Sequence, residues 1–447
     1  MLSFFYNKDS TALSKALIEH VKNGDLDEVR DLLEKGANVN YVDDLLGSTA
    51  LSWACSKGHS DVALEILKHE NVDVNIKDKY VGMTALVRAC SNKNLSDVAL
   101  EILKHESVDV NAKTEYDGTT ALFCACNKSL SNVALEILKH ENVDVNALHK
   151  NTGTTSLYWA CGNCLSNVAL EILKHENVNV NAKHTSDGTT AFYHACNKSL
   201  SDVALEILKR KNVDVNTKCS DGRTCLIWAC SKGHSDVALE ILKQKNADVN
   251  AKCSDGRTAL FLACFNGLSD VALEILKRKN VNVNAKGSDG RTALLLACYN
   301  GLSDVALEIS KQNNVDVVAK NNDTGTTALY WACNKSLPDV ALEILKHESV
   351  DINALHKNTG TTSLYWACCN SLSNVAFEIL KQKNVDVNAQ HNDGATALFW
   401  ACCNGLSDVA TEIMKQEHAN VNATLEYARK NGKRDIVRYL EMHFECQ

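Results

Sequence analysis

Cysteine is the residue type in this sequence with the widest chemical repertoire, because thiols form disulfides, bind metals and act as nucleophiles. The chain contains 19 cysteines, and eleven of them share one position of a motif that recurs every 34 to 36 residues. These are Cys55, Cys90, Cys126, Cys161, Cys196, Cys230, Cys264, Cys298, Cys333, Cys368 and Cys402. Equivalent residues of stacked helical layers lie about 10 Å apart, whereas a disulfide needs Cα atoms within about 7 Å. We therefore predict free, mostly buried thiols, which are typical of a reducing compartment.

Other patterns that indicate catalysis or metal binding are missing from the sequence. It has no phosphate-binding loop, Gly-x-Ser-x-Gly elbow, His-Glu-x-x-His motif or paired CxxC motif. The histidines and the remaining cysteines recur with the repeat, as structural residues do. We therefore expect no catalytic residue, no metal site and no cofactor, and an enzyme is the disfavoured interpretation.

The elements that position these residues follow a Thr-small-Leu motif. It stands at Thr49, Thr84, Thr120, Thr155, Thr190, Thr224, Thr258, Thr292, Thr327, Thr362 and Thr396. A period of this length is typical of a solenoid of stacked supersecondary units. We predict a short tail at 1–9, a capping repeat at 10–44, eleven central repeats at 45–422 and a second capping repeat at 423–447, thirteen repeats in all. The apolar residues of the tail are expected to cover the first repeat.

One repeat, residues 80–111, illustrates the expected unit. Gly82 lies in a tight turn, and a first short helix follows from about Thr84. A second helix is expected to begin at Ser96, as its N-cap, and proline is tolerated at this point in the copy that carries Pro338. After the second helix, asparagines are expected to adopt a left-handed conformation and to lead into an extended loop. These asparagines are Asn71, Asn142, Asn177, Asn212 and Asn384.

The repeat resembles the ankyrin repeat in its order of turn, helix, helix and extended finger. The resemblance rests on Gly82, Thr84, Leu86, Ala89 and the closing Asp-Val-Asn-Ala at 109–112, and it runs from about Ser10 to the end of the chain. It implies a mainly α solenoid that binds a protein or peptide through a concave groove and its finger loops. Two departures are the loss of the family's Thr-Pro-Leu-His and the valine at position 318, where other copies have asparagine.

The residues expected to contact a partner lie on the first helices and the fingers. All six tryptophans share one position of the first helix, and at Arg88 and His194 that position is polar. One interpretation is packing between repeats; the other is an aromatic strip along the groove, where tryptophan is a common hot-spot residue. The candidates are Trp159, Trp228, Phe265, Tyr299, Trp331, Arg223, Arg257 and Arg291. A polar or acidic peptide is one hypothesis for the partner.

The finger asparagines form a second candidate set. They resemble the asparagines of ankyrin arrays that a 2-oxoglutarate-dependent dioxygenase hydroxylates, although a structural use in bracing the loop is the favoured explanation. The candidates for hydroxylation are Asn75, Asn111, Asn146, Asn216, Asn250 and Asn388.

Composition narrows the remaining classes. A net charge of −8 argues against a nucleic-acid partner, and no apolar run is long enough to span a membrane. We expect a monomeric protein-binding scaffold in the cytoplasm, with the nucleus as the alternative location. An adaptor, or a host-directed effector that presents a target to a separate enzyme, is the alternative function.

Overall fold

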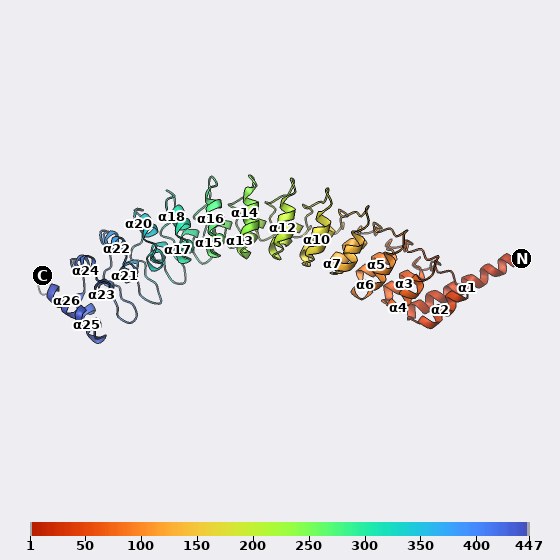
Figure 1. The fold of residues 1–447 in the computed structure, drawn as a ribbon, viewed down its shortest axis with the longest axis horizontal. Coiled ribbons are helices and arrows are strands. Elements are labelled where there is room, and N and C mark those ends of the chain that lie inside the picture. The colour runs from red at the N-terminus through yellow and green to blue at the C-terminus, as the bar shows by residue number, and fades with distance from the viewer. Residues whose placement is uncertain (1, 445–447) are drawn as a thin grey trace. The chain divides into compact units, whose positions relative to one another are not determined.

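The computed structural model describes residues 2–444, and within this range the regular structure is helical. The helices come in pairs, and successive pairs stack in chain order within each of two compact units (Figure 1). One unit ends at Ser220 and the other begins at Asp221. The predicted mainly α solenoid of stacked helix pairs is confirmed.

The first unit contains six helix pairs. Their first helices are α1 (Leu2–Asn23), α3 (Ala50–Lys57), α5 (Ala85–Ser91), α7 (Ala121–Asn127), α9 (Ser156–Gly162) and α11 (Ala191–Asn197). Their second helices are α2 (Leu26–Glu34), α4 (Ser60–Leu67), α6 (Ser96–Ile102), α8 (Ser131–Ile137), α10 (Ser166–Leu173) and α12 (Ser201–Leu208), and a 3-10 turn, η1 (Lys93–Leu95), precedes α6.

The second unit contains seven pairs. Their first helices are α13 (Cys225–Lys232), α15 (Ala259–Phe265), α17 (Ala293–Tyr299), α19 (Ala328–Asn334), α21 (Ser363–Cys369), α23 (Ala397–Cys403) and α25 (Val421–Lys430). Their second helices are α14 (Ser235–Lys243), α16 (Ser269–Leu276), α18 (Ser303–Ser310), α20 (Pro338–Leu345), α22 (Ser373–Leu380), α24 (Ser407–Met414) and α26 (Arg434–Phe444).

The recurring threonine begins the first helix of each central repeat. In α5, for example, the Thr84 hydroxyl accepts a hydrogen bond from the Val87 N–H, which caps the helix. The second helices differ from the prediction, because α6 begins at Ser96 and its N-cap is Leu95, whose side chain cannot accept a hydrogen bond. Pro338 occupies the first turn of α20, as predicted.

Left-handed backbone occurs in the turn between the two helices of a pair as well as in the finger turns. Glycine fills this position in five of the central repeats, at Gly58, Gly233, Gly267, Gly301 and Gly405, and all five have positive φ. Ser129, Cys164, Ser199, Ser336 and Ser371 adopt the same conformation in five others, with φ between 55° and 62°. Because a side chain at positive φ costs about 1–2 kcal/mol, these five turns are strained relative to the glycine turns.

The predicted left-handed asparagines after the second helix are confirmed only at Asn384, with φ 59°. The prediction was wrong for Asn71, Asn142, Asn177 and Asn212, which keep negative φ. After α4, the residue that follows the asparagine closes a turn: the Val72 N–H donates to the His69 carbonyl at 3.1 Å. That bond holds the intervening asparagine in a right-handed conformation.

The core of each unit lies between the two helices of each pair and between neighbouring pairs. In the specimen repeat Leu86 and Cys90 of α5 and Val98 and Ile102 of α6 are at most 1% exposed. All eleven cysteines at the recurring position of the first helix are free thiols. Ten of them are buried, and Cys402 is partly exposed. Burial raises the pKa of the Cys55 thiol to about 12, so it stays protonated and unreactive at neutral pH.

At the amino-terminal end, α1 continues through the predicted boundary between the tail and the first repeat. The side chains of residues 1–9 lie outside the described residues, and so does the predicted apolar cover that they would form.

Candidate protein-binding surface

The finger loops are joined from repeat to repeat by asparagine side chains. The Asn284 amide nitrogen donates to the Asn314 carbonyl at 2.6 Å, and its oxygen accepts from the Asp316 N–H at 2.8 Å. The same pair of bonds is formed by Asn40, Asn75, Asn111, Asn146, Asn181, Asn250, Asn353 and Asn388. This asparagine ladder holds each finger to the next within a unit.

The ladder is interrupted in the second unit by Val318. A valine side chain can neither donate nor accept a hydrogen bond, and it leaves the Asp351 N–H without the bond that the ladder gives its equivalents. An ion pair between Lys320 and Asp351, with an N–O distance of 2.6 Å, still spans this junction. The fingers on the two sides of Val318 thus lack the asparagine bonds and are joined by this ion pair and by the hydrogen bonds that Lys357 donates to the Thr324 and Asn322 carbonyls.

Five of the six hydroxylation candidates belong to this ladder, and Asn216 occupies the equivalent position. Each is partly exposed, and those with printed bonds use both amide atoms, as Asn75 does with Ser107 and Asp109 at 2.7 and 2.8 Å. Hydroxylation stays a prediction.

A second set of asparagines caps the first helices. The Asn300 amide donates to the carbonyls of Cys264 and Phe265 in the preceding repeat, at 2.8 and 3.0 Å. Asn163, Asn266, Asn370 and Asn404 make equivalent bonds. These amide groups therefore satisfy backbone carbonyls at the ends of the first helices.

The six tryptophans are all partly exposed, and Trp331, Trp366 and Trp400 also pack against rings of the preceding repeats. Trp331 meets Tyr299 of the preceding repeat edge to face, with centroids 4.7 Å apart. Trp366 donates a 2.8 Å hydrogen bond to the Tyr330 hydroxyl. In the first unit Trp159 packs edge to face on Phe123 at 6.1 Å. The tryptophan position thus combines packing between repeats with a remaining exposed surface.

Where the same position is polar, it is internally satisfied or packed. Arg88 forms a 2.7 Å ion pair with the almost fully buried carboxylate of Asp78. His194 packs edge to face on Tyr158 at 4.6 Å, and burial lowers its pKa to about 4, so it is neutral at pH 7. Neither side chain is a freely exposed cation.

The other candidates of the second unit gather on its first helices. Phe265 and Tyr299, at the ends of α15 and α17, are 45% and 44% exposed. Cations lie over these rings and over Trp228 and Trp331: Arg223 over Trp228 at 4.7 Å, Arg291 over Phe265 at 5.5 Å, Lys232 over Trp228 at 5.5 Å, and Lys335 over Tyr299 and Trp331 at 5.7 and 5.9 Å. These four rings and four cations are called the ring–cation row below.

The three candidate arginines are each held by an aspartate two residues earlier in the same finger turn. Arg257 Nε donates to Asp255 at 2.6 Å, and this bond holds the pKa of Asp255 well below its ordinary value. Arg291 lies 2.6 Å from Asp289, and Arg223 lies 3.1 Å from Asp221. The turn fixes the guanidinium groups and neutralises part of their charge, so Lys232 and Lys335 supply much of the positive charge of the row.

Sequence reasoning missed an apolar row on the second helices. Leu239, Leu273 and Leu307 hold equivalent positions in α14, α16 and α18, and each is only partly buried. The missed signal was the Ala-Leu-Glu segment of nine of the thirteen second helices, in which a leucine occupies a position that turns toward solvent.

Stacked helix pairs joined by extended fingers define a helical repeat protein built for contact along its length. The sequence profile described as "Ankyrin repeats (3 copies)" matches residues 17–114, 93–184, 167–253, 238–321, 310–391 and 372–446. The chain therefore belongs to the ankyrin repeat family, as the resemblance implied. Repeats of this family generally serve as protein-binding modules and are typically non-catalytic.

Among individual proteins, the chain is similar to osteoclast-stimulating factor 1. Identity is 36% over 73 residues for the Xenopus laevis protein and 34% over 73 residues for the Rattus norvegicus and Mus musculus proteins. These matches cover 16% of this chain and 34% of each relative. The chain thus spans about a third of the length of the curated relatives it matches.

Two further properties bear on the surface. None of the helices in residues 2–444 is long and apolar enough to cross a membrane. The same residues contain no group of three or more His, Cys, Asp or Glu side chains placed to hold a metal ion.

Proposed function

We propose that the chain is a non-catalytic scaffold that binds a partner protein or peptide across its first helices and finger loops. The observation that supports this proposal is the ring–cation row, where two nearly half-exposed aromatic rings, Phe265 and Tyr299, lie beside cations. Aromatic and arginine side chains are the residues that most often dominate binding energy at protein interfaces.

Rigidity favours the same function. Tyr299 and Trp331 of the row pack on each other from neighbouring repeats, and Arg223 and Arg291 are held by aspartates in their own turns. Side chains fixed before binding lose less conformational entropy when a partner docks. Lys232 and Lys335 are exposed at the row, so acidic groups of a partner would gain most from it.

The experiment compares proteins captured by the intact chain with those captured by a Phe265→Ala/Tyr299→Ala variant. Both side chains are nearly half exposed, so their removal leaves the core intact. The matched control is Tyr80→Ala/Tyr116→Ala, which removes two aromatic rings that are 68% and 74% exposed on fingers of the other unit.

Proteins retained by the wild type and by the control, but lost with the Phe265→Ala/Tyr299→Ala variant, are the expected outcome. If all three chains capture the same proteins in the same amounts, the partner does not bind at the ring–cation row. Peptide mass spectrometry of the native protein tests the hydroxylation proposal in the same material, since unmodified Asn75, Asn111 and Asn146 would exclude it there.

A further inference from the structure

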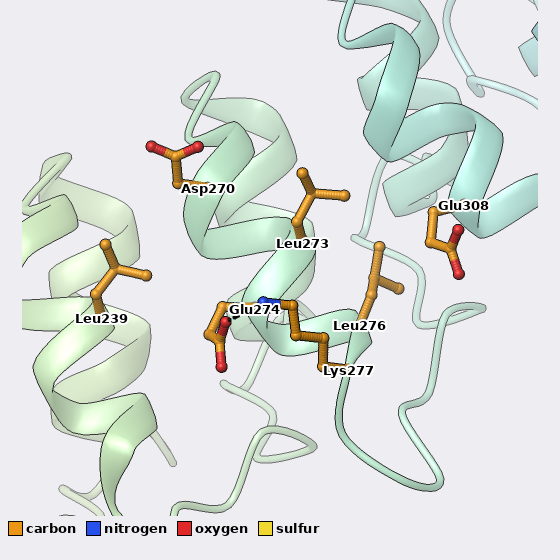
Figure 2. A pocket seen from close by; sticks show the side chains of 7 residues that line it. All are labelled: Leu239, Asp270, Leu273, Glu274, Leu276, Lys277 and Glu308. Carbon is orange, nitrogen blue, oxygen red and sulfur yellow. Dashed lines mark hydrogen bonds and ion pairs between the residues drawn. The ribbon is translucent and has the colours of Figure 1, made fainter.

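The second helices of the second unit carry an open groove, separate from the first helices that form the ring–cation row. It is a cavity of about 480 Å³ across α14, α16 and α18. Leu239, Leu273 and Leu276 supply its apolar wall (Figure 2). Cavities of roughly 300–1,000 Å³ with apolar walls are the usual size of ligand sites.

One leucine of the repeat pattern is less buried at the groove than its equivalents in neighbouring repeats. Leu276 ends α16 and is only partly buried, whereas the equivalent Leu242 and Leu345 are 1% and 7% exposed. In the next repeat this position is Ser310, and α16 packs directly against α18. A serine is too short to cover the neighbouring leucine, so apolar surface that other repeats bury stays open here.

The charges around the groove are mostly negative. Asp270, Glu274 and Glu308 line it, together with one cation, Lys277 (Figure 2). Lys277 is already paired with Glu274 at 2.8 Å. Asp270 and Glu308 are exposed, so the lining presents two carboxylates beyond the balanced pair.

We propose that this groove binds a basic amphipathic segment of a partner protein. One leucine-sized side chain of the segment packs against Leu273 and Leu276, in the space that a leucine at position 310 would cover. Lysine or arginine side chains beside it pair with Asp270 and Glu308. An acidic segment is repelled by the same carboxylates, which makes the groove selective for charge as well as for shape.

The proposal does not depend on the function of the ring–cation row, because it uses different helices and the opposite charge. The two surfaces would allow one chain to hold two partners at once. Failure of either test therefore leaves the other proposal standing.

The probe is a fluorescein-labelled amphipathic peptide whose leucines recur three and four residues apart on one face, with lysines beside them. Binding to the full chain is followed by fluorescence anisotropy. A peptide with glutamates in place of the lysines, and one with alanines in place of the leucines, test charge and apolar contact separately. The proposal requires the leucine–lysine peptide to bind at least about tenfold more tightly than either of them.

Three variants locate the site. Leu273→Ala removes apolar wall and is expected to weaken binding about tenfold, while Glu308→Lys reverses one rim charge and is expected to weaken it about fivefold. Ser310→Leu restores the residue of the neighbouring repeats and is expected to block the space beside Leu276. The matched control is Leu135→Ala, because Leu135 is an equally half-buried leucine at the same position of α8. This variant should bind as the wild type does.

Three results would overturn the proposal. The first is equal binding of the lysine and glutamate peptides. The second is a Leu135→Ala variant that loses as much affinity as Leu273→Ala, because the peptide would then bind the leucine row generally. The third is a concentration-dependent dimer, seen by sedimentation velocity of the chain alone, that Leu273→Ala abolishes, because the occupant would then be a second copy.

Discussion

The gap in the asparagine ladder at Val318 allows the stability contributed by the inter-repeat hydrogen bonds to be measured both by adding them and by removing them. Replacing Val318 by asparagine should restore the two missing bonds, because the loop around it already has the form of the other fingers. The Val318 N–H already donates to Asp316 Oδ1 at 3.2 Å. The backbone N–H of a ladder asparagine makes the same bond, as Asn75 does to Asp73. Val318 is 39% exposed, so little apolar burial is lost in the exchange.

The size of the effect follows from the bonds gained. A neutral hydrogen bond contributes a net 0.5–1.5 kcal/mol or so, so two bonds should stabilise this junction by about 1–3 kcal/mol. The reverse change, Asn284→Val, removes two bonds of 2.6 and 2.8 Å and leaves the Asn314 carbonyl and Asp316 N–H without them. It should cost at least as much.

Amide hydrogen exchange is the suitable assay, because a repeat array unfolds in parts and a global midpoint averages over them. In Val318→Asn, exchange at the Asp351 amide should slow by about tenfold or more, and in Asn284→Val exchange at the Asp316 amide should quicken similarly. Val318→Thr is the control, since its side chain has the same shape without the amide. Unchanged exchange at Asp351 in Val318→Asn, or equal slowing in Val318→Thr, would refute the reasoning.

Three further predictions concern the turns, the carboxylates and the thiols. Ser336→Gly and Ser371→Gly should each stabilise the second unit by up to about 1 kcal/mol, because glycine relieves the strain of a side chain at positive φ. Gly301→Ala should destabilise the unit for the same reason. Thermal melts of the three variants measure these effects, and a stabilising Gly301→Ala would contradict the prediction. Partial burial alone would raise the pKa of Asp117, but hydrogen bonds from Thr114 and Thr119 outweigh it and lower the pKa to about 2. About 2 kcal/mol of stability should therefore be present above the ordinary aspartate pKa near 4 and be lost as the pH falls toward 2, a loss that Asp117→Asn should lack when melts are compared across this range. Iodoacetamide should modify the exposed Cys164 and Cys403 first. Burial raises the pKa values of Cys55 and Cys230 to about 12, so these two thiols should react only on unfolding. Early labelling of Cys230 in peptide maps would show that the buried thiols are accessible in the folded chain.

Most of the fold could be predicted from local sequence patterns. The Thr-small-Leu step located the first helices to within a residue, since a threonine cap acts on the three residues after it. The buried faces of α5 and α6 followed from the spacing of Leu86, Cys90, Val98 and Ile102, because helical periodicity is a property of one segment.

The features that sequence reasoning missed depend on neighbouring repeats. Asn300 could be placed at a helix end from the sequence, but its bonds reach carbonyls of the preceding repeat. The backbone at Ser336 is left-handed, but only other repeats, such as the one with Gly301, have a glycine at this position that would indicate it. The groove beside Leu276 arises from a serine 34 residues later, and its consequence emerges only when the two helices are packed together.

Site-specific photo-crosslinking tests the central claim most directly. A photoreactive phenylalanine analogue is placed at position 299, in the ring–cation row, or at position 116, on an exposed finger of the other unit, and the chain is exposed to its native cell extract. We expect position 299 to form a discrete covalent adduct with a partner protein and Phe265→Ala in the same chain to reduce this adduct. Adducts of equal yield from positions 299 and 116, unaffected by Phe265→Ala, would contradict binding at the ring–cation row.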